Sequence, residues 1–324
     1  SKLVSQWSKL QKQAKTDFNR KTEMKVFAYN PTGTTDTVMS PLDSIKYHQM
    51  HMQAGMLAVD PSTGEVKAWV GGTDHNYFQY DHINSNRQVG STFKPFIYTT
   101  ALLGGLSPCF KVRDMQYSIA SGDSNFGLLS KWEPSNATGK FSGEDLTLYE
   151  GLRQSKNSVS VWLMKELGNV DVVRNLAGNM GIPKDKIPQA PSISLGAAEL
   201  SLMDMTGAYT TFANNGVHSK PIFVTKIEDK NGRLIYRAVP EEQTALPKNY
   251  NYVMVDMLKY AARFISGNFE SEVGGKTGTT NDYVDGWFMG ITPDLVVGTW
   301  VGGDLPWIRF RSLADGQGGV MARP

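Results

Sequence analysis

Residues 54–70 read AGMLAVDPSTGEVKAWV and give the clearest strand signal in the chain. Two apolar-rich runs flank a turn that contains proline and glycine, a pattern typical of a β-hairpin. Strand signals return near the other end of the chain, at 286–291 and 295–301, on either side of the turn Thr-Pro-Asp. We expect the early hairpin and this late pair to join one antiparallel sheet.

The middle of the chain, residues 91–215, has a different character. Helical periodicity dominates there, most clearly at 159–167 and 200–214. A further hairpin is predicted where 222–227 and 234–237 flank the turn Asp-Lys-Asn-Gly. Strand runs that are segregated from helical runs indicate an α+β fold and not a doubly wound α/β fold. The predicted fold is an antiparallel β-sheet flanked by helices, with a mostly helical subdomain.

Composition excludes several classes of protein. The chain has 324 residues, 40% of them hydrophobic and 20% charged, which is ordinary for a globular protein. A formal net charge of +2 gives no reason to expect a nucleic-acid partner. The single cysteine, Cys109, cannot form an intramolecular disulfide. No stretch approaches the ~18 consecutive apolar residues that a membrane span needs.

The first 25 residues are polar and helix-prone, with seven lysines or arginines against two acidic residues. A solvated surface helix explains them, and a basic connector to a preceding domain or to a membrane surface is the alternative. Residues 26–47 are predicted to be an irregular or extended linker, with a turn at Asn30-Pro31-Thr32-Gly33. We therefore expect an N-terminal helix and linker over 1–50, which leads from an upstream domain, and one domain over 51–324.

Residues 87–95 read RQVGSTFKP and place Ser91 and Lys94 one helical turn apart. A serine hydroxyl is a poor nucleophile at neutral pH and needs a nearby base. Lysine can be that base only if burial or a neighbouring cation lowers its pKa. A serine in the first helical turn also lies near free backbone N–H groups, which favour a developing oxyanion. The string indicates an acyl-transfer centre. The alternative is an exposed polar pair on a helix without a catalytic role, which would have the same sequence pattern.

The string Ser155-Lys156-Asn157 comes just before a helical run. Ser155 offers a second hydroxyl that can pass a proton, and Asn157 offers an amide that can hold a substrate carbonyl and a lysine amine. A rival Ser-x-Asn occurs at 266–268, in a polar stretch that contains glycine. We favour the first string because the rival lies only eight residues before the next motif.

That next motif, KTGTT at 276–280, follows two glycines and suits the edge of a β-strand. Lys276 would supply positive charge for a substrate carboxylate and would also lower the pKa of Lys94. Gly278 would remove a side chain that could block an extended substrate from pairing with the strand. A plain edge strand with a solvated lysine is the alternative.

Together and in this order, the three strings resemble those of the transpeptidase domain of class A (bifunctional) penicillin-binding proteins. The resemblance covers roughly residues 50–303 and includes RQVG before Ser91, WEPSN at 132–136 and FANNG at 212–216. It implies the fold that these proteins share with serine β-lactamases. From the family we expect a glycosyltransferase domain and a membrane anchor upstream of this sequence, a longer stretch between Tyr260 and Gly274, and a final helix after Pro324.

The resemblance also implies roles for the motif residues. Ser91 would attack the carbonyl of the penultimate D-alanine of a peptidoglycan stem peptide, and Lys94 would take its proton. Ser155 would relay the proton to the leaving D-alanine, and Asn157 would hold Lys94 and the substrate amide. The terminal carboxylate would be bound by Lys276 and by the substrate-binding strand residues Thr277, Gly278 and Thr279. The backbone N–H groups of Ser91 and Thr279 would form the oxyanion hole. No metal or dissociable cofactor is implied.

The implied reaction ends when an amine of a neighbouring stem peptide resolves the acyl-enzyme and forms a cross-link. A β-lactam resembles D-Ala-D-Ala and would acylate the same serine. The family places such a domain on the extracytoplasmic (periplasmic) face of the bacterial cytoplasmic membrane, with a glycosyltransferase domain and anchor in the parent chain. Two alternatives remain. A serine β-lactamase-like hydrolase would need a water-activating carboxylate, typically in Glu-x-x-Leu-Asn, which this sequence lacks. A non-enzymatic β-lactam sensor would lack the long N-terminal connector.

Overall fold

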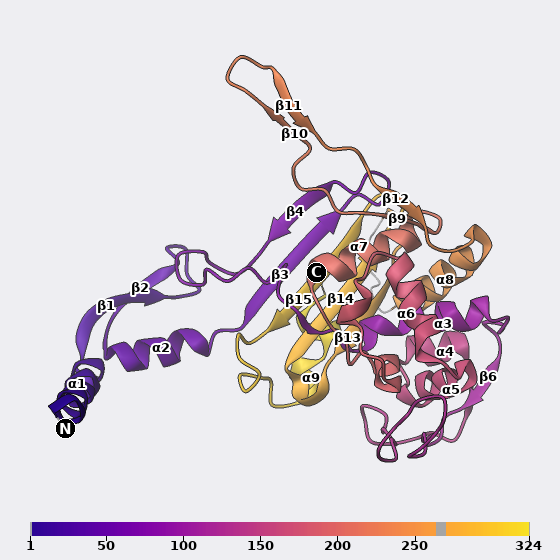
Figure 1. The fold of residues 1–324 in the computed structure, drawn as a ribbon, viewed down its shortest axis with the longest axis horizontal. Helices are drawn as coiled ribbons and strands as arrows, with labels where there is room; N and C mark the ends of the chain where they lie inside the picture. The colour runs from indigo at the N-terminus through magenta and orange to yellow at the C-terminus, as the bar shows by residue number, and fades with distance from the viewer. Residues whose placement is uncertain (1, 264–269, 324) are drawn as a thin grey trace.

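A five-stranded antiparallel sheet forms the centre of the computed structural model, which describes residues 2–263 and 270–323 (Figure 1). Its strand order is β13-β14-β15-β3-β4. Val296 of β15 pairs with Val59 of β3, so the early hairpin and the late strands share one sheet as predicted. The strands are β3 (Gln53–Val59), β4 (Val66–Val70), β13 (Gly274–Thr279), β14 (Asp285–Ile291) and β15 (Val296–Gly302).

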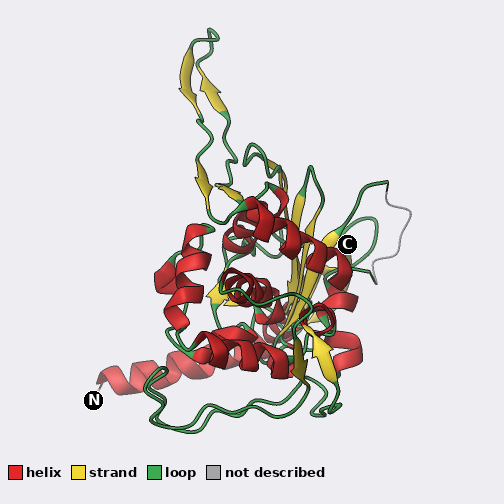
Figure 2. Cartoon of the chain, turned by 90° about the vertical axis from the view of Figure 1, so that its right-hand side faces the viewer, coloured by secondary structure: helices red, strands yellow, loops and turns green. Residues whose placement is uncertain are grey.

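Helices cover both faces of this sheet, which Figure 2 shows nearly edge-on. A side chain at Gly298 would meet Thr206 of α7 on one face, and one at Gly286 would meet Met321 of α10 on the other. The larger helical layer lies on the face of the sheet that α7 covers. Helical layers packed on an antiparallel sheet confirm the predicted α+β fold. The helices of the domain are α3 (Lys94–Leu103), α4 (Leu148–Arg153), α5 (Asn157–Leu167), α6 (Val170–Asn179), α7 (Leu202–Ala213), α8 (Lys248–Ala261), α9 (Leu313–Gly316) and α10 (Gly318–Met321).

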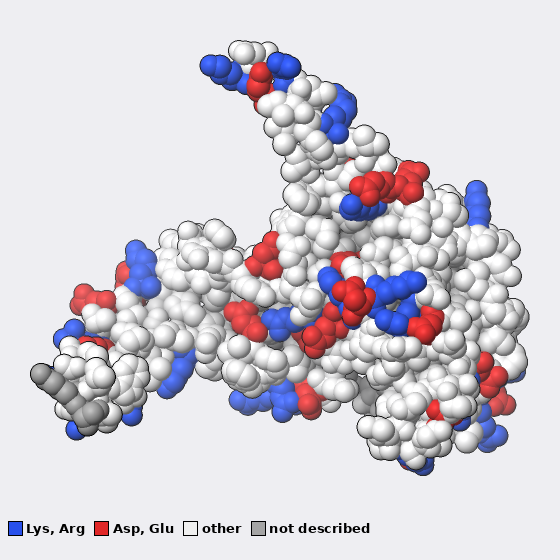
Figure 3. Space-filling view, viewed as in Figure 1, with Lys and Arg blue, Asp and Glu red and all other residues white. Residues whose placement is uncertain are grey.

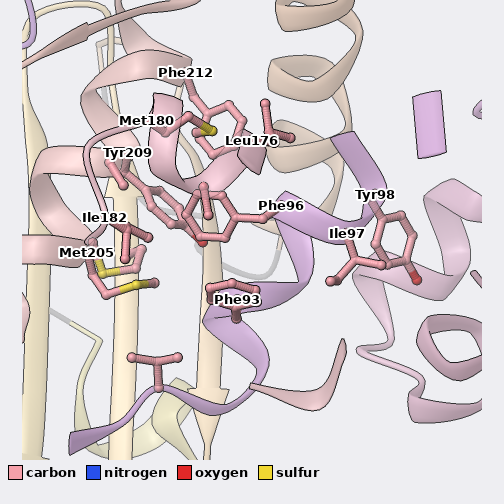
Figure 4. Packing of buried hydrophobic residues seen from close by; sticks show 14 of the residues in the cluster. Phe93, Phe96, Ile97, Tyr98, Leu176, Met180, Ile182, Met205, Tyr209 and Phe212 are labelled. Atoms are coloured by element: carbon pink, nitrogen blue, oxygen red, sulfur yellow. The ribbon is translucent and has the colours of Figure 1, made fainter. Parts of the chain in front are cut away.

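Helix α3 lies in the middle of the helical layer and is buried on all sides from Lys94 to Leu102. Aromatic rings pack around its first turns, with the ring centroids of Phe93 and Phe96 4.8 Å apart and those of Tyr209 and Phe212 5.3 Å apart (Figure 4). The Tyr209 hydroxyl donates a hydrogen bond to the carbonyl of Thr92 at 2.6 Å. Such packing fixes the start of α3 because close-packed interiors resist small displacements.

The N-terminal region differs from the predicted linker. Helix α1 (Lys2–Asn19) is exposed along its described side chains, as a surface helix should be. The prediction of an irregular or extended linker at 26–47 is right only in part: the extended residues of β1 (Thr22–Phe27) and β2 (Thr34–Met39) pair as a hairpin, and helix α2 (Pro41–Gln49) follows. The turn Asn30–Gly33 is therefore a hairpin turn. Ser40 caps α2 by accepting a hydrogen bond from the N–H of Asp43, and Pro41 begins the helix.

The remaining strands of the domain form short two-stranded antiparallel pairs. A hairpin of β10 (Lys226–Glu228) and β11 (Leu234–Arg237) projects from the top of the body in Figure 1, so the predicted hairpin is present but begins four residues later. The other pairs are β5 (Arg87–Gln88) with β8 (Glu199–Leu200), β6 (Lys111–Arg113) with β7 (Asp145–Thr147), and β9 (Val217–Ser219) with β12 (Glu242–Thr244).

Charged side chains of both signs are interspersed on the face shown in Figure 3, without a broad single-sign surface. Over the residues that the structure describes, no helix combines the length and apolar character needed to cross a bilayer.

Candidate active site

Ser91 lies in the 3₁₀ turn η1 (Gly90–Phe93), which runs directly into α3 at Lys94. Gly90 has a φ of +53°, in the left-handed region, and a β-carbon there would lie 2.8 Å from the carbonyl oxygen of Thr279. Only glycine allows this close approach without strain. The glycine therefore lets the turn that carries Ser91 lie directly against strand β13.

The amine of Lys94 is fully buried and lies against the Ser155–Asn157 segment. Its Nζ donates to the backbone carbonyl of Ser155 at 2.6 Å and to Oδ1 of Asn157 at 2.8 Å, and it lies 3.4 Å from Oγ of Ser155. A neutral lysine amine has two N–H donors and one lone pair. The two short bonds use both donors of the neutral amine and leave its lone pair free to accept a proton.

Lys276 approaches the same serine from β13. Its Nζ is 2.9 Å from Oγ of Ser155 and 2.9 Å from the carbonyl of Thr277, and its side chain is only 2% exposed. Ser155 has a φ of +54°, which is uncommon for a residue other than glycine. This backbone conformation places the Ser155 hydroxyl between two lysine amines.

Burial changes the acid–base chemistry of both lysines. It lowers the pKa of Lys94 well below that of an ordinary lysine, and the nearby charge of Lys276 lowers it further. Burial also lowers the pKa of Lys276 to about 7. Desolvation disfavours the charged form of an amine, and a second cation acts in the same direction. The sequence-based expectation that Lys276 depresses the pKa of Lys94 thus agrees with the direction and causes of the shift.

A cleft of about 870 Å³ opens above these groups. Ser91, Ser155 and Asn157 line its floor, and Thr277 and Thr279 line the β13 side. Trp132 and residues 134–138 also line the cleft. Lys276 lies below Ser155 instead of in the cleft wall, so the hydroxyls of the two threonines are better placed than its ammonium to meet a substrate carboxylate.

Gly278 has a different role from the one predicted. A β-carbon there would lie 2.7 Å from the carbonyl oxygen of Val89 and 2.9 Å from Cγ2 of Thr92. The missing side chain makes room for η1, not for substrate. The steric reason predicted for this glycine therefore differs from the one in the structure, because β13 presents alternate residues to opposite sides. A substrate contact through the backbone of Gly278 stays a prediction.

The rival string at 266–268 lies outside the described residues, as does most of the short stretch between Tyr260 and Gly274. Sequence reasoning also missed a structural role for Asn136. Its Oδ1 accepts hydrogen bonds from the N–H groups of Asn157 at 2.9 Å and Ser158 at 3.2 Å. This side chain caps the first turn of α5 from a distant loop. The sequence held only one hint of this role, the position of Asn136 at the end of WEPSN.

One carboxylate lines the cleft among the described residues, that of Asp282. It lies 3.1 Å from the guanidinium of Arg309, and its side chain is 72% exposed. A base that activates water should be held within hydrogen-bonding reach of the reacting carbonyl. An exposed carboxylate that pairs with an arginine is poorly suited to that role.

Comparisons with known proteins agree with this geometry. Residues 54–301 match the family model of the penicillin-binding protein transpeptidase domain, and residues 2–52 match that of the penicillin-binding protein middle domain. Penicillin-binding protein 1A of Aquifex aeolicus is 35% identical over 78% of this chain and 35% of its own length. The chain thus spans about a third of the length of the curated relatives it matches.

Two solved structures share the fold. Penicillin-binding protein 1A of Haemophilus influenzae gives a TM-score of 0.72 at 23% identity, over 83% of this chain and 45% of that one. PonA1 of Mycobacterium tuberculosis, in complex with penicillin V, gives 0.70 at 23% identity, over 98% of this chain and 86% of that one. Since the family model covers most of the chain, including all three motifs, the chain belongs to the penicillin-binding protein family and carries its transpeptidase domain.

Proposed function

We propose that this chain is a serine D,D-transpeptidase that cross-links peptidoglycan stem peptides through an acyl-enzyme on Ser91. One observation carries the proposal: a buried lysine with a depressed pKa lies one turn after Ser91, with a second serine between it and another buried lysine. This arrangement supplies a nucleophile, a neutral base and a proton relay in one cleft.

In the first half of the reaction, Oγ of Ser91 attacks the carbonyl carbon of the penultimate D-alanine. The proton of the Ser91 hydroxyl passes to the lone pair of Lys94. The tetrahedral intermediate is stabilised by the backbone N–H groups of Ser91 and Thr279, both of which belong to residues of the cleft. As the C–N bond breaks, the proton travels from Lys94 through Ser155 to the nitrogen of the departing D-alanine.

Ser155 suits this relay because its Oγ lies between both lysine amines, 2.9 Å from Lys276 and 3.4 Å from Lys94. Asn157 keeps Lys94 in place through Oδ1, while its Nδ2 donates to the carbonyl of Ser135 at 2.8 Å. The terminal carboxylate of the stem peptide meets the hydroxyls of Thr277 and Thr279. Lys276 then acts mainly on the proton relay and adds longer-range positive charge.

In the second half, the amine of another stem peptide attacks the acyl-enzyme carbonyl. Its proton returns through Ser155 and Lys94 to Ser91, and the new amide bond is the cross-link. A second cleft of about 680 Å³ shares Gln88, Thr280 and Asn281 with the first and gives a second peptide room to approach. When the donor is a β-lactam, acylation opens the ring and no leaving group departs. The adduct should persist, since the single described carboxylate of the cleft is poorly placed to activate water.

The parent protein should also carry a peptidoglycan glycosyltransferase domain and a membrane anchor that holds this domain on the extracytoplasmic face. Support comes from the similarity to class A penicillin-binding proteins, of whose length this chain spans about a third. D-Ala-D-Ala carboxypeptidase activity, in which water replaces the acceptor amine, belongs to the same proposal as a slow side reaction.

A fluorescent penicillin tests the proposal directly. We expect one adduct per chain, mapped to Ser91 by peptide mass spectrometry, and no adduct in Ser91→Ala. The matched control is Ser192→Ala, since Ser192 lines the same cleft and has no motif role. Labelling at another residue would refute the assignment of the nucleophile. Continuous turnover of a chromogenic cephalosporin, in place of a single burst, would identify a hydrolase instead.

A further inference from the structure

Asp114 is a buried carboxylate for which the proposed reaction has no role. It follows strand β6 directly, lies far from the three motifs in sequence, and has 0% of its surface exposed. A buried carboxylate is costly unless it is paired and fully hydrogen-bonded. The environment of Asp114 meets this requirement with five donor contacts: Lys156 Nζ at 2.7 Å, Ser142 N–H at 2.9 Å, Ser142 Oγ at 3.0 Å, Ser158 Oγ at 2.6 Å and Asn136 Nδ2 at 2.8 Å.

Two of these donors flank Asn157, the last residue of the second motif. Lys156 and Ser158 bracket Asn157, the residue whose Oδ1 holds Lys94. The carboxylate thus bonds the side chains on either side of Asn157. Oδ2 accepts from Lys156 and Oδ1 from Ser158, so one rigid planar group spans the junction where α5 begins.

A second connection runs through Asn136. An amide side chain can present either its oxygen or its nitrogen to a neighbour. Because the carboxylate of Asp114 accepts from Nδ2 of Asn136, the amide must turn Oδ1 towards α5. That oxygen accepts from the N–H of Asn157, and the adjacent carbonyl of Ser135 accepts from Nδ2 of Asn157. Asp114 therefore orients the cap that holds both the backbone and the side chain of Asn157.

The segment held in this way is strained at one point. Ser155 has a φ of +54°, a backbone conformation that costs energy for a residue other than glycine and persists only where the surroundings enforce it. The residue after it, Lys156, is tied to Asp114. This contact is one of three that hold the turn, together with those that Asp114 makes with Ser158 and Asn136.

We propose that Asp114 is a positioning residue for the transpeptidase reaction, which holds Ser155 and Asn157 in register with Lys94 through Lys156, Ser158 and Asn136. The inference rests on the function proposed above. Asp114 does not line the cleft and so acts through these neighbours, not on the substrate.

The test measures the rate constant for acylation by a fluorescent penicillin in Asp114→Asn. The asparagine side chain has the shape of the aspartate side chain, but it replaces one acceptor oxygen with an NH₂ group. That group faces hydrogen-bond donors that need an acceptor. We expect the rate to fall on the order of 10²-fold, the size of effect that a misplacement of about 1 Å can produce. The acid limb of the pH–rate profile should also shift to higher pH. A displaced segment lets water reach Lys94, and hydration of this amine raises its pKa. Lys276 of β13 is the charged group that faces Lys94, and it is unchanged in this variant.

Two further variants separate positioning from folding. Asp114→Asn combined with Lys156→Met removes both charges of the buried pair and should fold more readily than the single variant. It should keep the loss in acylation rate, because an amide offers one oxygen where the carboxylate offered two, so Asn136 and Ser158 compete with Ser142 for a single acceptor. Asp204→Asn is the matched control. Asp204 also pairs with a lysine, Lys186, at 2.7 Å and caps α7 through Ser201, away from the cleft. It should lower the unfolding temperature and leave the acylation rate unchanged.

Each outcome is decisive. A folded Asp114→Asn with a wild-type acylation rate and an unmoved acid limb overturns the inference. Failure of both Asp114 variants to fold assigns Asp114 a purely structural role and also overturns it. If the unaltered chain itself forms no adduct on Ser91, the proposed function fails instead, and the two failures are told apart.

Discussion

The two sides of the Ser155–Asn157 segment hold lysines in opposite ways. On one side, the ammonium of Lys156 pairs with the carboxylate of Asp114 at 2.7 Å, and the ion pair is completed by neutral donors. On the other side, Lys94 meets carbonyl oxygens, a hydroxyl and a second buried lysine. The charge of Lys156 is compensated by Asp114, and this ion pair fixes the backbone. The amine of Lys94 has no carboxylate partner, so it is uncompensated and loses its proton easily. Three residues of sequence therefore join a structural ion pair to a reactive base.

The largest effect should follow from removal of the uncompensated amine. Lys94→Met should lower the acylation rate constant of Ser91 by about 10²–10⁴-fold, the usual contribution of a general base. The unfolding temperature should stay the same or rise, because a buried amine with no carboxylate partner is replaced by an apolar chain of similar length. Rapid labelling with fluorescent penicillin and thermal denaturation measure the two quantities.

Lys165→Met is the control for this variant, since Lys165 is a lysine of α5 whose Nζ donates to the carbonyl of Ser118 at the surface. It should label at the wild-type rate. A large fall in the unfolding temperature of Lys94→Met would instead show that this amine stabilises the fold. Lys94 and Lys156 would then both have structural roles, contrary to the comparison drawn above.

The pH dependence of stability gives the next largest effect. The pKa of Lys276 falls to about 7 in the folded chain, against about 10.4 for an exposed lysine. Between these values the unfolded chain binds a proton that the folded chain does not, so stability rises with pH across this window and is lost as pH falls towards 7. The slope approaches about 1.4 kcal/mol per pH unit for one proton. Lys276→Met should flatten it.

Urea denaturation between pH 7 and pH 10 measures this slope. Lys94 adds to the slope in the same direction, because burial and the nearby charge of Lys276 lower its pKa well below that of an ordinary lysine. An equal slope in the wild type and in Lys276→Met would mean that Lys276 is protonated in the folded chain throughout, contrary to the geometry.

Changes to the Lys156–Asp114 ion pair should affect the free energy of unfolding more than the acylation rate. Lys156→Met leaves the carboxylate of Asp114 buried without its counter-ion, which typically costs about 3–5 kcal/mol. Because Asn136 and Ser158 keep their acceptor, the acylation rate of the folded chain should stay within about tenfold of the wild type, well short of the loss expected for Asp114→Asn. Chemical denaturation and penicillin labelling on the same sample would separate these effects.

The smallest effect is expected for Ser158→Ala, which removes one of the donors to Asp114 at 2.6 Å. A hydrogen bond to a charged group contributes about 1.5–3 kcal/mol. The loss in unfolding free energy should lie in this range and be smaller than that of Lys156→Met. A reversed order would show that the ion pair is not the main compensation for the buried carboxylate.

The sequence predicted the parts of the molecule whose signals are local. Alternation and turn residues identified the two hairpins of the central sheet, and the order of three short strings identified the family. Asp114 could not be found in this way, because its five contacts come from four residues, Asn136, Ser142, Lys156 and Ser158, whose positions in the sequence do not point to residue 114. Its importance arises only when folding brings these points together.

The errors also have physical causes. Residues 26–47 were expected to be an irregular or extended linker around the turn at Asn30–Gly33, but Thr34–Met39 is rich in β-branched residues and pairs with Thr22–Phe27 as a hairpin. Gly278 was interpreted from the substrate side because the sequence does not reveal which side of a strand faces the core. The contact of Gly278 with Val89 and Thr92 decides that question, and it needs coordinates.

The projecting hairpin of β10 and β11 offers a practical opportunity. Its tip, Asp229–Gly232, is exposed or half-exposed, and Gly232 has open space around it with a φ of +80°. Exposed loop tips are the places where inserted sequence is best tolerated. The tip points away from the body and from the motif strands in Figure 1. A short epitope or a fluorophore attachment sequence placed between Asn231 and Gly232 would make this domain visible in cells while the cleft stays open.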